Sequence, residues 1–141
     1  MRTELTEELL DGELEVVRDS LTSGSVEIWR EGTDILVRFD LGRDGRPGLF
    51  RLGCSQFDAE PPTVSMVDPI TRAELPLEQW TPGVPHSIHP GTGKPFVCLQ
   101  GTAEYHTHPS HVQDGWDRYR RVFRLKQTVH RLLQKAGVAF G

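Results

Sequence analysis

The sequence predicts a single α+β domain, in which an N-terminal helix is followed by a four-stranded antiparallel sheet, a proline-rich loop and a C-terminal helix. Apolar residues recur at helical spacing near both ends of the chain, whereas they alternate with polar residues through much of the first half. Eight of the ten prolines lie between residues 61 and 95, which disfavours regular structure there. The length of 141 residues fits one domain with its own core.

We expect this domain to span 1–141, with a helix in 1–22, the sheet in 25–68, an active-site loop region in 69–114 and a second helix in 115–137. The first helix carries a regular apolar face. Its members are Leu5, Leu9, Leu10, Leu14, Val17 and Leu21.

Four short runs in residues 25–68 have the composition and alternation of strands. They are 26–30, 35–41, 49–52 and 63–67. The Asp44-Gly45 dipeptide between the second and third runs is a strong hairpin signal. The runs therefore predict an antiparallel meander.

Beyond residue 115 the spacing is helical again, with basic residues over much of the surface opposite the apolar face. The apolar face comprises Trp116, Tyr119, Val122, Phe123, Val129, Leu132, Leu133 and Ala136. We expect Trp116 to lie in the core and to fix the start of this helix.

Composition argues against two classes of partner. The formal net charge is −4, whereas nucleic-acid-binding domains are normally basic. The apolar runs are only a few residues long, so we expect no membrane span, and the N-terminus has no apolar signal core. A cytoplasmic protein is expected, in which both cysteines, Cys54 and Cys98, stay reduced.

The segment from Ser87 to Trp116 concentrates side chains that can attack, ligate metals or move protons. It contains Cys98, His89, Glu104, His106, His108, His111 and Asp114. Cys54 follows an apolar run and is expected in the core. His89-Pro90 is expected to form a structural turn, and His130 to lie on the surface or in packing. For His86 and His111, structural and functional roles are equally open.

Three stretches in order resemble the ubiquitin-conjugating enzymes. The run 57–64 with Pro61-Pro62 is similar to that family's turn into its fourth strand, and His89-Pro90 to the start of its His-Pro-Asn motif. The stretch 93–99, Gly-Lys-Pro-Phe-Val-Cys-Leu, is similar to its active-site segment. The resemblance implies the family's fold, with Cys98 as a nucleophile that accepts a ubiquitin-like protein as a thioester and passes it to an amine. The implied partners are an activating enzyme, a ubiquitin-like protein and a target protein, and no cofactor is needed.

One departure from that family affects the expected chemistry. Gly91 stands where the family has the asparagine that supports the oxyanion, so His106, His108 or backbone N–H groups become candidate donors. A carboxylate, Glu104 or Asp114, would orient or deprotonate the incoming lysine. We therefore expect a catalytic set of Cys98, Glu104, His106 and His108.

The spacing Cys98-x5-Glu104-x-His106-x-His108 also resembles the bacterial Cys-Glu-His-His family, which is labelled as predicted metal-binding and found in operons that resemble ubiquitin conjugation systems. That resemblance implies a role in antiviral defence and, as an alternative to catalysis, a zinc site of Cys98, Glu104, His106 and His108. On an extended strand Glu104 and His108 would lie about 13 Å apart, and on a helix His106 would point away, so only a curved loop gathers all four ligands. A non-catalytic binder of a ubiquitin-like protein is the third possibility.

Overall fold

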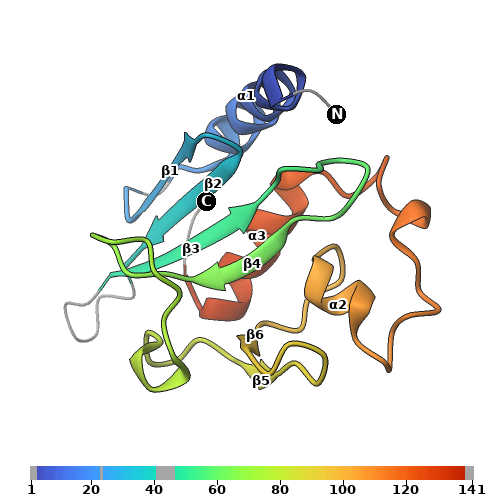
Figure 1. Ribbon diagram of the computed structural model, residues 1–141. Helices are drawn as coiled ribbons and strands as arrows, with labels where there is room; N and C mark the ends of the chain where they lie inside the picture. The colour runs from blue at the N-terminus through green and yellow to red at the C-terminus, as the bar shows by residue number, and fades with distance from the viewer. Residues whose placement is uncertain (1–2, 23, 41–46, 139–141) are drawn as a thin grey trace.

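The computed structural model describes residues 3–22, 24–40 and 47–138 (Figure 1). Within them the chain is an α+β protein with a four-stranded antiparallel sheet, which confirms the predicted class. The principal elements are α1 (Thr3–Ser20), β1 (Val26–Glu31), β2 (Asp34–Phe39), β3 (Gly48–Gly53), β4 (Thr63–Met66), α2 (Ala103–Thr107) and α3 (Leu125–Ala136).

The sheet has the order β1-β2-β3-β4, and each strand pairs antiparallel with the next. One row of side chains crosses all four strands, because Ile28 pairs with Val37, Val37 with Phe50, and Phe50 with Met66. All four are buried, and they lie on the face that forms the main core. The predicted Asp44-Gly45 hairpin lies outside the described residues, between two strands that do pair as antiparallel neighbours.

Helices α1 and α3 pack against each other and share one core with the sheet (Figure 1). From α1 the core takes Leu10, Leu14 and Val17, whereas Leu5 remains 54% exposed. Glu13 of α1 accepts hydrogen bonds from the Leu125 N–H (3.1 Å) and from Nε of Arg124 (3.2 Å). A carboxylate is thus placed at the N-terminus of α3, where helix N–H groups lack partners within the helix.

The second helix is shorter than the 115–137 predicted from the apolar spacing. Trp116–Arg118 forms only a 3-10 turn, η2, and regular α-helix begins at Leu125. Residues spaced three apart come together in consecutive turns as well as in an α-helix. The apolar spacing alone therefore could not distinguish a series of turns from a helix. Val122, predicted on the apolar face, is 68% exposed.

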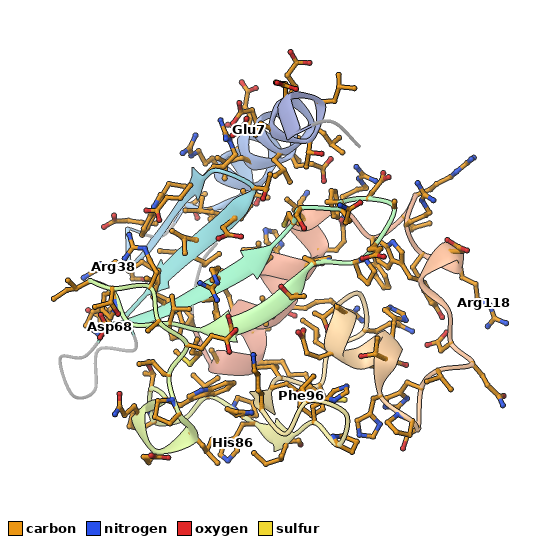
Figure 2. The ribbon with its side chains drawn as sticks, viewed as in Figure 1. Glu7, Arg38, Asp68, His86, Phe96 and Arg118 are labelled. Atoms are coloured by element: carbon orange, nitrogen blue, oxygen red, sulfur yellow. The ribbon has the colours of Figure 1, made fainter. Side chains whose placement is uncertain are left out.

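The segment between β4 and α3 forms a lobe beside the sheet, in the lower and right-hand parts of Figure 1. Its elements are short: the 3-10 turn η1 (Leu77–Gln79), β5 (Ser87–Ile88), β6 (Pro95–Phe96), α2 and η2. Strands β5 and β6 pair as a small antiparallel hairpin. Figure 2 shows His86 and Phe96 on this lobe. No helix in the described part of the chain is long and apolar enough to cross a membrane.

Candidate active site around Cys98

Cys98 lies two residues after β6, at a point where its neighbours are buried but its own side chain is exposed. Phe96, Val97 and Leu99 are 2%, 3% and 5% exposed, so packing fixes the backbone on both sides of the cysteine. The Cys98 Sγ atom lies 3.9 Å from Nε2 of His111. An accessible thiol beside an imidazole nitrogen is the arrangement from which a thiol proton can be transferred.

His111 stacks on Tyr105, and Tyr105 is held by Asp114. The two rings are nearly parallel, with centroids 4.2 Å apart and an interplanar angle of 9°. The Asp114 carboxylate accepts hydrogen bonds from Tyr119 Oη (2.5 Å), Tyr105 Oη (2.7 Å) and Gln100 Nε2 (2.8 Å). These three donors lower the pKa of Asp114 to about 2, so the carboxylate stays ionised at neutral pH.

His106 uses both of its ring nitrogens in hydrogen bonds to the backbone. The Gly101 N–H donates to Nε2 (3.1 Å), which places the ring proton on Nδ1, where it is donated to the Asp114 carbonyl (2.6 Å). His106 therefore ties the loop that follows Cys98 to the loop that contains His111. No ring nitrogen is left to act as an oxyanion donor or a metal ligand in this arrangement.

His108 lies beside the Cys98–His111 pair. Its ring centroid is 5.5 Å from that of His111 and 5.9 Å from that of Phe96. The Ser110 N–H donates to Nδ1 (3.1 Å), so the ring proton belongs on Nε2. Among the described residues Nε2 has no hydrogen-bond partner, so this ring, whose centroid is 5.5 Å from that of His111, carries one unused N–H donor.

Glu104 points from α2 to the outer edge of β4. Its Oε1 accepts a hydrogen bond from the Val64 N–H (2.9 Å), so the carboxyl caps part of the free strand edge. The side chain lines a cavity of about 230 Å³, together with Lys94, Glu74 and Trp80. Burial raises the pKa of the Glu104 carboxyl to about 7, and the Val64 N–H only partly offsets this.

Replacing Glu104 by glutamine is expected to stabilise the protein at high pH but not at low pH. The raised pKa of Glu104 contributes stability that is full below about pH 4.5 and is lost as the pH rises through about 7. Glutamine keeps the acceptor for Val64 but carries no charge, so its advantage in unfolding free energy grows to about 1–3 kcal/mol at pH 8. Denaturant unfolding at pH 5 and pH 8 measures this difference. The exposed Glu78→Gln serves as the control, and an equal effect of Glu104→Gln at both pH values would contradict the assignment.

The buried side chain of His89 stabilises the turn before Cys98 by hydrogen bonds to the backbone. The ring is only 2% exposed, its Nδ1 accepts from the Gly91 N–H (2.9 Å), and its Nε2 donates to the Glu104 carbonyl (3.1 Å). A Cβ atom at Gly91 would lie 3.0 Å from Cε1 of His89. This packing gives a local reason for glycine, rather than asparagine, at that position.

The four residues predicted as the catalytic set, or alternatively as zinc ligands, do not converge on one point. Cys98 faces His111, Glu104 faces β4, and His106 is held between backbone groups. Among the described residues no three His, Cys, Asp or Glu side chains are close enough together to hold a metal ion.

The other candidate residues have structural positions. Cys54 is 1% exposed, and burial raises the pKa of its thiol. His130 Nε2 lies 2.7 Å from Ser20 Oγ, and His86 packs edge-on against Trp80. The predicted catalytic set did not include His111, whose role was left open, or Tyr105, because neither stands at a recognisable spacing from Cys98 and only the folded loops bring them together.

No model of a known protein family matches the sequence, and no curated protein is found that is similar to it. The class of protein must therefore be inferred from the chemistry of the site.

Proposed function

We propose that the chain is a conjugating enzyme for a ubiquitin-like protein, with Cys98 as the nucleophile that carries the acyl group as a thioester. The observation that supports this most is the exposed Cys98 thiol, held by buried neighbours with the Nε2 atom of His111 at 3.9 Å. The N-terminal helix and the four-stranded antiparallel sheet that precede Cys98 are compatible with the fold that this proposal requires. An activating enzyme, the ubiquitin-like protein and a target protein are the proposed partners, in the cytoplasm.

The proposed loading step begins with the thiolate, which is the attacking form of cysteine. With its ring proton on Nδ1, His111 can accept the Cys98 proton at Nε2 while Sγ attacks the carbonyl carbon of the incoming thioester. The new S–C bond forms, the bond to the donor sulfur breaks, and the donor leaves as a thiol with the proton from His111. An amine of the target then attacks the Cys98 thioester, which forms an amide and regenerates the Cys98 thiol.

The oxyanion formed in both steps needs hydrogen-bond donors. His108 is the proposed side-chain donor, since the Nε2–H of its ring has no other partner in the described part of the chain, whereas His106 is fully engaged. Asp114 already accepts three side-chain hydrogen bonds, and Glu104 faces the β4 edge. We therefore assign both carboxylates a role in holding the site rather than in deprotonating the amine.

Replacing His111 by asparagine is expected to slow the loading of Cys98 by about 10- to 100-fold, because a positioned proton acceptor is lost. The probe is a short peptide that ends in Gly-Gly as a small-thiol thioester, which mimics the tail of a ubiquitin-like protein without requiring the activating enzyme. Intact mass measured over time gives the rate of acyl transfer to Cys98. The exposed His86→Asn is the matched control, and loading of His111→Asn at the wild-type rate would overturn the proposal.

A further inference from the structure

Among the aromatic rings around His111, that of Tyr105 makes the closest contact. Its Nδ1 has no hydrogen-bond partner within the described residues, and its Nε2 faces Cys98. The stacked ring of Tyr105 is 4.2 Å away, whereas the next ring, that of His108, is tilted at 5.5 Å. The face of Tyr105 is therefore the packing contact that best accounts for the orientation of the His111 ring.

Tyr105 is fixed at both ends. Its backbone N–H donates to Oγ1 of Thr102, the N-cap of α2 (3.3 Å), which anchors the main chain. Its hydroxyl donates to Oδ2 of Asp114 (2.7 Å), which anchors the far side of the ring. A charge-assisted hydrogen bond of this kind is stronger than one between neutral groups.

Asp114 connects the two loops that carry the reactive atoms. Its carboxylate accepts from Gln100, two residues after Cys98, and its backbone N–H donates to the carbonyl of His111 (2.9 Å). Its ionised carboxylate thus holds the cysteine loop, the histidine loop and the ring of Tyr105 in a single arrangement. Asp114 thus positions both Cys98 and His111 relative to each other.

We propose that Tyr105 is a positioning residue, which holds the imidazole of His111 against Cys98 by stacking, and that Asp114 fixes Tyr105 and both loops in that arrangement. Neither residue touches the acyl group. The inference rests on the proposed function only through the Cys98–His111 pair, and it deepens that function by identifying what controls the reactivity of the thiol. Phenylalanine at position 105 would keep the stacking and lose the hydrogen bond, whereas alanine would lose both.

The test is a double-mutant cycle read by the rate of Cys98 alkylation with iodoacetamide at pH 7, with the modified cysteine identified by peptide mass. His111→Asn and Tyr105→Ala are each expected to slow alkylation by about tenfold, since either change removes the positioned proton acceptor. The double variant is expected to be no slower than either single one, because residues that act through each other are not additive. Tyr105→Phe is expected to recover most of the rate.

Melting temperatures of all variants separate loss of positioning from loss of folding. If Tyr105→Ala does not fold, Tyr105→Leu takes its place in the cycle, because leucine fills part of the same volume but has no aromatic face to stack on His111. Wild-type alkylation in folded Tyr105→Ala, or effects that multiply in the double variant, would overturn the inference. If the alkylation rates follow the expected cycle but no acyl transfer to Cys98 is seen, the proposed conjugation is overturned and the positioning role of Tyr105 stands. The two can be separated because alkylation requires no acyl donor.

Discussion

Replacing Cys98 by alanine is expected to abolish the thiol-labile acyl adduct that forms with a Gly-Gly thioester peptide. Cys98 is the exposed cysteine of the chain, and the other cysteine, Cys54, is 1% exposed with the pKa of its thiol raised by burial. A buried thiol in its protonated form neither meets the peptide nor attacks it. Intact mass before and after treatment with dithiothreitol measures the adduct.

The matched control for this loss is Cys54→Ala, which removes the second thiol and leaves the site untouched. This variant is expected to load to the wild-type extent, at a modest cost in stability from the small cavity in the core. A thiol-labile adduct that persists in Cys98→Ala, or that disappears in folded Cys54→Ala, would show that the assignment of the nucleophile to Cys98 is wrong.

Truncation of Trp116 to alanine is expected to lower the free energy of unfolding by about 3–5 kcal/mol, the usual range for a buried aromatic residue. Trp116 is 7% exposed, and its Nε1–H donates to the Asp58 carbonyl (2.8 Å). Its ring also packs at 5.8 Å from the ring of His106, which ties the two active-site loops together. Denaturant unfolding measures the stability, and Cys98 loading is expected to slow in parallel.

Trp116→Phe and Trp29→Ala are the controls for this prediction. Phenylalanine keeps most of the buried surface and loses the hydrogen bond, so its expected cost is about 1–2 kcal/mol. Trp29 is only partly buried, in a separate small cluster on the other face of the sheet, so its loss should leave Cys98 loading unchanged. A Trp116→Ala protein as stable as the wild type would contradict the placement of this side chain in the core.

The sheet was predictable because its signal is local. Alternating residues place Ile35, Val37 and Phe39 on one face of β2 whatever the rest of the chain does, and all three are fully buried. The start of α3 was not predictable from the same kind of pattern. Its first N–H groups bond to Gln127, which is local and accepts from the Arg124 N–H, and to Glu13, more than a hundred residues earlier, which accepts from the Leu125 N–H.

The segment that holds the candidate site could also be singled out from the sequence, whereas the contacts within it could not. Cys98 could be chosen from its polar neighbourhood in the sequence, but its distance to His111 depends on how the turns after α2 fold. Glu104 and His106 have the residue types of catalytic groups or metal ligands. Their hydrogen bonds to Val64, Gly101 and Asp114 depend on the folded structure and could not be predicted from the spacing of these residues in the sequence.

The most direct test of the central claim is the fate of the Cys98 thioester in the presence of free lysine. Protein loaded with the Gly-Gly peptide is isolated, lysine is added, and the amide product is followed by mass spectrometry beside a thioester of the same peptide on a short unstructured cysteine peptide. A conjugating enzyme is expected to transfer the acyl group to lysine at least about tenfold faster than the unstructured thioester does. Equal rates, or hydrolysis without amide formation, would contradict the claim that this site transfers acyl groups to amines.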